Sequence, residues 1–214
     1  MSTSYLQRLV EVMDQLRSPG GCPWDAEQTH ESLIKYLLEE SYEFIDTVAE
    51  SERIGMREEL GDILLQVYFH SRSAQEHPTD PFTIEDVAKV ITEKLISRHP
   101  HVFGDKKVSG SEEVIANWEE IKAAEKGRTS ALDGVAISQP ALSLINKLLY
   151  RAEKYGVELQ VPTYSENSPA TSESVGSALL AVISWAHKNG IDPEDALRVQ
   201  SKQLMREIAQ QEAR

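Results

Sequence analysis

Two short segments of the sequence carry paired carboxylates at a spacing that suits a divalent metal ion. Glu40 and Glu43 are three residues apart, and Glu59 and Asp62 repeat this spacing further along the chain. Residues three or four apart share one face of an α-helix, so each pair would present two carboxylates to the same side. All-oxygen ligand sets favour Mg²⁺ and also suit Mn²⁺. The four acids therefore predict a Mg²⁺ site, with Mn²⁺ as the alternative metal.

The second pair lies between two apolar flanks of its own helix pattern. One flank consists of Met56, Leu60, Ile63 and Val67, and the other of Leu65 and Phe69. A carboxylate in such a place is costly unless it is neutralised, and neither pair has a Lys or Arg on its own face. This favours an external cation over the plainer interpretation, in which the four residues are ordinary solvent-facing acids. A di-iron bundle would use Glu-x-x-His pairs, and His70 is not three residues from any of these acids.

The overall charge limits the partners that the chain could bind. Its 214 residues include 35 acidic and 22 basic side chains, which gives a net charge of −13. Nucleic acids and anionic membranes attract clustered Lys and Arg, so we expect neither as a partner. The single cysteine, Cys22, excludes an intrachain disulfide. No apolar run approaches the roughly 20 residues of a membrane span, and the first residues lack a signal-peptide pattern, so we expect a cytoplasmic protein.

The elements that must position these acids are all predicted to be helices. Apolar residues recur at helical spacing, and no convincing strand alternation is present. The predicted helices cover residues 4–17, 29–50, 53–75, 83–97, 109–126, 140–155, 173–188 and 192–211, with a loop over 98–111. Capping signals support four of the starts: Thr29, Thr83 with Asp86, Ser109 with Glu112, and Asp192 followed by Pro193.

The pattern also predicts how the chain is divided. Residues 1–126 form a complete helical domain, residues 127–139 a linker, and residues 140–214 a smaller helical segment. A polar stretch with two prolines, residues 157–172, interrupts that last segment, and we expect it to be mobile.

Several motifs follow one another in an order and at a spacing that resembles the MazG nucleoside triphosphate pyrophosphohydrolases, over about residues 4–133. They are Gly21-Cys-Pro-Trp-Asp25, Gln28-Thr-His30, Leu38-Glu-Glu-Ser-Tyr-Glu43, Arg57-Glu-Glu-Leu-Gly-Asp62, Arg98-His-Pro-His-Val-Phe103 and Asn117-Trp-Glu-Glu-Ile-Lys122. The resemblance implies an intertwined, all-α MazG-like homodimer. It also implies Mg²⁺-dependent hydrolysis of nucleoside triphosphates to monophosphate and pyrophosphate, as house-cleaning of the nucleotide pool. Glu40, Glu43, Glu59 and Asp62 would then be the catalytic metal ligands.

The same resemblance implies residues that contact the nucleotide. Lys94 and Arg98 lie four apart near a helix end, and Trp118 and Lys122 share a face of the next helix. The plainer alternatives are that Lys94 and Arg98 complement a helix dipole and that Trp118 is a core anchor. Trp24 could stack on a base or hold its own loop in place.

The C-terminal part resembles the remnant of a second MazG copy. Ser130-Ala-Leu-Asp133 and the helix after Pro140 match the start of such a copy, but a helix with a second acidic pair is missing. Ser174 stands where Glu59 would be, and Ser177 where Asp62 would be, so we expect this part to bind no metal. Alternatively, the whole chain is a catalytically weak dimer that acts as a nucleotide-binding or regulatory protein.

Overall fold

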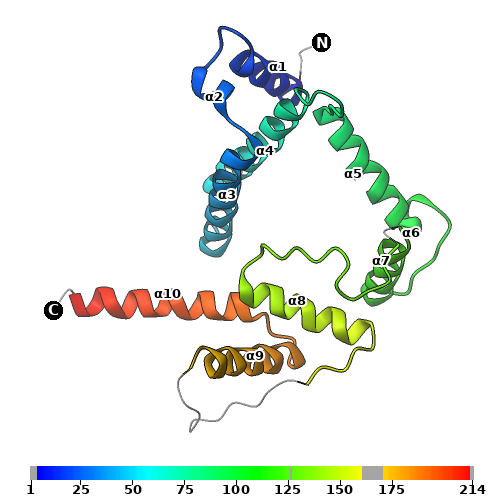
Figure 1. Cartoon of the computed structure of the whole chain (residues 1–214), viewed down its shortest axis with the longest axis vertical. Helices are drawn as coiled ribbons and strands as arrows, with labels where there is room; N and C mark the ends of the chain where they lie inside the picture. Colours follow the sequence, from blue (N-terminus) through cyan, green and yellow to red (C-terminus); the bar gives the residue numbers. More distant parts are fainter. Residues whose placement is uncertain (1–3, 126, 161–170, 213–214) are drawn as a thin grey trace. The chain divides into compact units, whose positions relative to one another are not determined.

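The computed structural model describes the backbone of residues 4–125, 127–160 and 171–212, and every regular element in these ranges is an α-helix (Figure 1). This confirms the predicted all-α class. The helices are α1 (Tyr5–Arg17), α2 (Pro23–Glu27), α3 (His30–Glu50), α4 (Arg53–Ala74), α5 (Ile84–Arg98), α6 (Pro100–Phe103), α7 (Ser111–Glu125), α8 (Ala141–Lys154), α9 (Ser172–Lys188) and α10 (Pro193–Glu212). Contacts divide the chain into a first unit, Met1–Trp118, and a second unit, Glu119–Arg214, with the boundary inside α7.

The core of the first unit lies where α1 packs against the antiparallel pair α3 and α4. Its buried members are Met13, Leu33, Tyr68 and Phe69, and Ile84 at the start of α5 packs against them. Burying a side chain of this size stabilises the fold by roughly 1.5–3 kcal/mol. The core therefore fixes α3 against α4, which are the two helices that carry the acidic pairs.

A tight turn joins α3 to α4. The α3 helix starts at a capping box between Thr29 and Ser32, as the sequence predicted for Thr29, and ends at Ser51, whose backbone is left-handed with φ of 58°. Four residues beyond the turn, Gly55 has no side chain, and a Cβ there would lie 2.8 Å from the Thr47 methyl group. The glycine thus lets the two helices approach closely just after the turn.

A buried arginine ties the first helix to the loop that follows it. The Nη1 of Arg17 donates to the carbonyl oxygens of Asp25 and Gln28, at 2.6 and 3.0 Å. Its Nε and Nη2 donate to the two carboxylate oxygens of Glu76, each at 2.9 Å, and Arg72 also binds Glu76. Four of the five N–H donors of this guanidinium are thereby used within the first unit.

Two short helices and one cap differ from the sequence predictions. The α2 and α6 helices occupy stretches predicted as loops, and each begins at a proline, Pro23 or Pro100. Proline is favourable at the first helical position, but four or five residues are too few to show a helical period. At the start of α7, Ser109 bonds to the carboxylate of Glu113 rather than to that of Glu112.

The second unit packs α8 against α9 and α10. Its buried apolar side chains are Leu149, Ala152, Ile183 and Ala186. Asp192 caps α10 as predicted, because its carboxylate accepts from the N–H groups of Glu194 and Asp195. Of the predicted mobile stretch 157–172, residues 161–170 lie outside the described residues. None of the helices described is both long and apolar enough to span a membrane.

Candidate functional site

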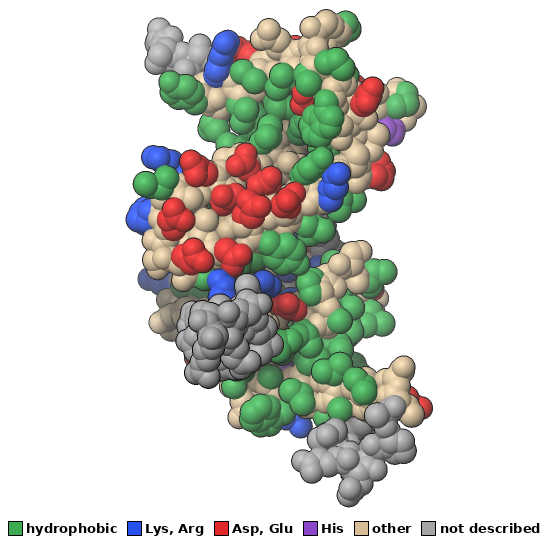
Figure 2. Space-filling model, turned by 90° about the vertical axis from the view of Figure 1, so that its left-hand side faces the viewer, with side chains coloured by type: hydrophobic (Ala, Val, Ile, Leu, Met, Phe, Trp, Pro, Cys, Tyr) green, Lys and Arg blue, Asp and Glu red, His purple; other side chains and the backbone are tan. Residues whose placement is uncertain are grey.

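Three of the four predicted acids come together on the facing sides of α3 and α4. Each of Glu40, Glu43 and Glu59 offers a carboxylate oxygen, and these oxygens lie within 4.8 Å of one another. Within the part of the chain that the structure describes, this is the one group of three or more acidic, His or Cys side chains so placed. Figure 2 shows acidic side chains gathered in one patch on this side of the molecule.

The register of the helix pair explains this convergence. Glu43 and Glu59 each lie eight residues from Ser51, and Glu40 and Asp62 each lie eleven residues from it. In an antiparallel pair with a short turn, residues at equal distances from the turn lie at about the same height along the two helices. Thr47 and Gly55, which almost touch, obey the same rule at four residues. The turn at Ser51 thus places the first acidic pair opposite the second.

Burial and the close approach of the carboxylates raise the pKa values of two of them. Partial burial raises the pKa of Glu40, and the charges of Asp62, Glu43 and Glu59 raise it further. Burial also raises the pKa of Glu59, with added contributions from the charges of Glu43 and Asp62 and from a hydrogen bond with Glu43. Asp62 therefore belongs to this electrostatic cluster, although it lies outside the group within 4.8 Å. We call these four residues the acidic cluster.

The acidic cluster fits a divalent cation. Among the described residues, no Lys or Arg forms an ion pair with any of its four carboxylates, and no basic group lowers the pKa of Glu40 or Glu59. Hard oxygen ligands without an internal counter-charge are the donor set that Mg²⁺ prefers. Both features agree with the metal site predicted from the sequence.

The residues predicted to contact a nucleotide lie on other elements. Lys94 and Arg98 are near the end of α5. Ile84, at the start of this helix, packs against the core of the first unit. Arg98 is fourteen residues further on, so it lies about 21 Å along the helix from that core contact. The Arg98 side chain is buried, and its guanidinium lies 6.0 Å from the centre of the Trp118 ring. Lys122 follows one turn after Trp118 on α7 and belongs to the second unit. The structure thus brings Arg98 and Trp118 together.

The position of Trp24 is relevant to both of its predicted roles, which are stacking on a base and holding its own loop in place. Its ring is half exposed and meets the ring of Tyr36 edge to face, with 5.9 Å between centres. Tyr36 lies one turn before Glu40 on α3. The contact anchors α2 to the helix that carries the first acidic pair, while one side of the indole remains open to solvent.

Sequence reasoning missed the positioning roles of Gly55 and Tyr36. The signal for Gly55 was available, because Gly55 and Thr47 are equally distant from the turn, but a glycine inside a helix pattern does not identify its neighbour. The contact of Tyr36 with Trp24 depends on α2, which the sequence did not predict.

In the second unit, the positions that the sequence pattern matched with Glu59 and Asp62 are occupied by Ser174 and Ser177. Ser174 closes the capping box of α9, where its hydroxyl accepts from the N–H of Thr171 at 2.9 Å. Ser177 follows one turn later and is partly buried. Neither side chain carries a charge that could replace a carboxylate ligand.

Comparisons with known proteins agree with the geometry of the first unit. Residues 28–103 match the sequence model of the MazG nucleotide pyrophosphohydrolase domain. The chain is 37% identical to the nucleoside triphosphate pyrophosphohydrolase/pyrophosphatase MazG of Thermotoga maritima, covering 96% of this chain and 85% of that protein. It is 35% identical to the nucleoside triphosphate pyrophosphohydrolase of Escherichia coli K12, covering 98% and 88%. An uncharacterised 26.1 kDa protein of Streptomyces cacaoi is 45% identical over 89% of this chain and 75% of its own.

Proposed function

Because this chain belongs to the MazG family of nucleoside triphosphate pyrophosphohydrolases, we propose that its acidic cluster carries out that hydrolysis. The products are a nucleoside monophosphate and pyrophosphate. The observation that carries the proposal is the convergence of Glu40, Glu43 and Glu59 within 4.8 Å. A triphosphate and this cluster are both anionic, so they can meet only if a cation lies between them.

Mg²⁺ is the cation that the cluster suits best. When bound, Mg²⁺ would neutralise phosphate charge and lower the pKa of a coordinated water. Glu40, Glu43, Glu59 and Asp62 would hold it. The facing helices preset the positions of these carboxylates, so little conformational entropy is lost when the cation binds.

Basic and aromatic residues outside the cluster would bind the rest of the nucleotide. We assign this role to Lys94, Arg98, Trp118 and Lys122, with Trp24 as a further contact. The contact between Arg98 and Trp118 supports the assignment, because a buried guanidinium held near a ring is oriented before any phosphate arrives. The exposed side of Trp24 is free to stack on a base.

A second copy of the chain completes the proposed assembly. Large apolar side chains remain exposed along α3, α4 and α5. These residues are Ile34, Leu38, Tyr42, Ile45, Val48, Ile54, Leu60, Val67, Val90, Ile91, Leu95 and Ile96. Monomers rarely leave so much apolar surface in water. A homodimer that buries these residues would explain the exposure of Leu60 and Val67, which the sequence places on an apolar flank.

The test is pyrophosphate release from nucleoside triphosphates, measured with Mg²⁺ and after EDTA treatment. We expect release by the wild type with Mg²⁺ and none by Glu59→Gln, which keeps the side-chain shape and removes the charge. Glu50→Gln, on an exposed part of α3 outside the cluster, is the matched control and should keep full activity. Full turnover by Glu59→Gln would contradict the assignment.

A further inference from the structure

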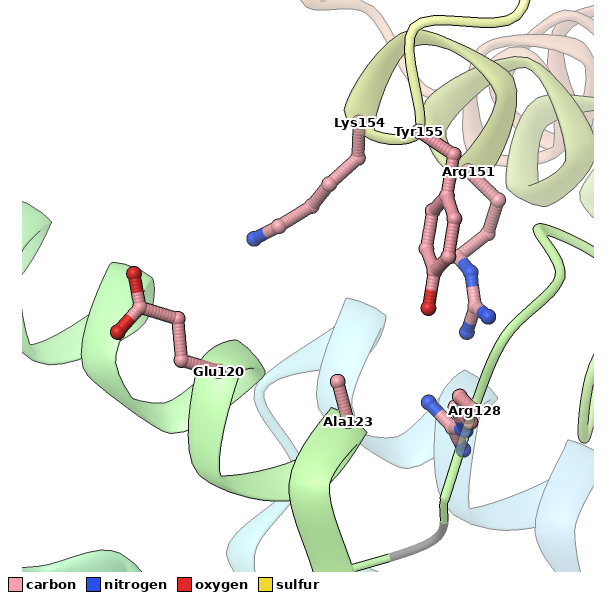
Figure 3. Close-up of a pocket in the computed structure, with 6 residues that line it drawn as sticks. All are labelled: Glu120, Ala123, Arg128, Arg151, Lys154 and Tyr155. Atoms are coloured by element: carbon pink, nitrogen blue, oxygen red, sulfur yellow. The ribbon is translucent and has the colours of Figure 1, made fainter.

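The second unit contains a cavity whose walls are mainly basic. Its volume is about 290 Å³, and it lies between the end of α7 and the end of α8 (Figure 3). The lining residues are Glu120, Ala123, Arg128, Arg151, Lys154 and Tyr155. Figure 3 shows the ring of Tyr155 beside the side chain of Arg151, with Arg128 below them, whereas Lys154 extends toward the side of the cavity where Glu120 lies. The lining residues thus include three basic side chains and one acidic side chain, Glu120.

Arg151 is buried yet incompletely bonded. Only 3% of its surface is exposed. Its Nη2 donates to the carbonyl oxygens of Ser130 and Asp133, both at 3.3 Å, and its guanidinium lies 5.2 Å from the centre of the Tyr155 ring. Its buried Nε has no hydrogen-bond partner among the described residues. An unsatisfied buried donor on a charged group is costly, so Arg151, which lines the cavity, is a residue whose bonding the chain itself leaves incomplete.

Arg17 of the first unit shows what such an arginine binds when it is satisfied. It also donates to two loop carbonyl oxygens, but its Nε and Nη2 are both bonded to the carboxylate of Glu76. Arg151 has the carbonyl bonds without the carboxylate. An oxyanion would complete the bonding of Arg151 in the way that the Glu76 carboxylate completes that of Arg17.

The charge of Asp133 interacts with those of Arg151 and Arg128, but among the described residues no carboxylate accepts a hydrogen bond from Arg151. Asp133 is committed to its own turn, because its carboxylate accepts from the N–H groups of Thr129 and Ser130 at 2.8 and 2.9 Å. Neither Arg128 nor Lys154 forms an ion pair within the described part of the chain. Arg128 lies against Gly134, where a Cβ would come within 3.1 Å of its Nη2, so the turn leaves room for this guanidinium.

We propose that this cavity binds a short phosphate chain, as in inorganic pyrophosphate or the diphosphate tail of a nucleotide. Phosphate oxygens match the paired donors of a guanidinium, and two linked phosphates could engage Arg128, Arg151 and Lys154 together. The volume suits a small ligand of this kind. This site uses no metal and no residue of the acidic cluster, so it stands whether or not the first unit hydrolyses nucleotides.

The test is calorimetric titration of the full-length protein with sodium pyrophosphate in EDTA, which removes metal-dependent binding. We expect the wild type to bind and the double variant Arg128→Gln/Lys154→Gln to bind roughly tenfold more weakly or worse. Lys147→Gln, an exposed position on the same helix, removes one charge and should bind as the wild type does. No binding by the wild type, equal binding by the double variant, or an equal loss in Lys147→Gln would overturn the proposal.

Two further arms sharpen the result. A nucleoside diphosphate that binds more tightly than pyrophosphate, with the gain lost in Tyr155→Ala, would identify the nucleotide tail as the source; equal affinities would identify free pyrophosphate. Arg151→Lys keeps the charge but removes the Nε donor, and we expect it to weaken binding. Because Arg151 also holds the 130–133 turn, circular dichroism must show that this variant folds, and the double variant tests the site independently.

Discussion

The two units treat charge in opposite ways. The first unit gathers the carboxylates of the acidic cluster without a basic partner, whereas the second unit gathers Arg128, Arg151 and Lys154 around a cavity. Both units contain a buried arginine that holds two loop carbonyl oxygens, but only Arg17 has a carboxylate to complete its bonding. The difference teaches that helices alone do not set the charge of a site, because helices carry clustered acids in the first unit and clustered basic side chains in the second.

The contrast between the acidic first unit and the basic second unit predicts its largest effect for variants of the acidic cluster, which should lose hydrolysis. Glu59→Gln or Asp62→Asn should lower turnover by roughly 100-fold or more while the helices remain folded, because each change removes a metal-binding charge. Ser177→Ala, at the position that the sequence pattern predicts to match Asp62, should leave turnover unchanged. The measurement is pyrophosphate release at saturating Mg²⁺ beside circular dichroism and light scattering. A marked loss in Ser177→Ala would show that both units share the chemistry.

Substrate binding should respond less strongly. Lys122→Ala should lower kcat/KM by about tenfold, because a charge-assisted hydrogen bond to a phosphate oxygen is lost. Arg98→Ala should do the same and should also lower the melting temperature, because Arg98 is buried against Trp118. Steady-state kinetics over a range of triphosphate concentrations would measure both. Unchanged kcat/KM in the two variants would return these residues to purely structural roles.

Metal binding should also stabilise the first unit. Added Mg²⁺ should raise the melting temperature of the wild type by roughly 2–8 °C and leave that of Glu59→Gln almost unchanged. The raised pKa values of Glu40 and Glu59 mean that their ionised forms destabilise the metal-free fold above those pKa values. In EDTA near pH 7, Glu59→Gln should therefore melt no lower than the wild type. An equal Mg²⁺ response in both proteins would place the binding elsewhere.

The smallest effect concerns Arg17 and its carboxylate. Hydrogen bonds from Arg17, followed by the charges of Arg17 and Arg72, lower the pKa of Glu76 below 4.5. A lowered pKa stabilises the fold above the unfolded value and loses that contribution as the pH falls through the folded value. Glu76→Gln should therefore cost about 1 kcal/mol or less at pH 7, since the pair is partly exposed, and the cost should fade below pH 4.5. Urea unfolding at pH 7 and pH 3 measures it, with Glu27→Gln as the control. A cost that is the same at both pH values would contradict the ion pair.

The sequence predicted the parts of this molecule that depend on local patterns. The starts of α3, α5 and α10 follow from capping residues such as Thr29 and Thr83, whose bonds span only three residues. The two acidic pairs were visible because helical spacing places i and i+3 on one face. That the two pairs approach each other across the turn was indicated only indirectly, because neither pair has a Lys or Arg on its own helix face.

Other features depend on distant residues and left no local signal. Arg17 and Glu76 are 59 residues apart, and nothing in either segment identifies the other. The orphan Nε of Arg151 depends on where the 130–133 turn lies against α8. Pro23 and Pro100 each start a helix too short for any period to appear. These features required coordinates.

Because the two acidic pairs are equally distant from Ser51, the number of residues in the turn is itself important for function. A substitution at Ser51 or Glu52 changes how stable the turn is but leaves Glu43 opposite Glu59. One inserted residue would instead rotate the whole of α4 by about 100° relative to its partner and advance it by about 1.5 Å. Glu58 would then take the place of Glu59 opposite Glu43, but Gly61 would take the place of Asp62 opposite Glu40, so the cluster would have one carboxylate fewer although the sequence had lost no acid. Between Glu40 and Asp62, descendants of this sequence can therefore drift in composition far more freely than they can gain or lose residues.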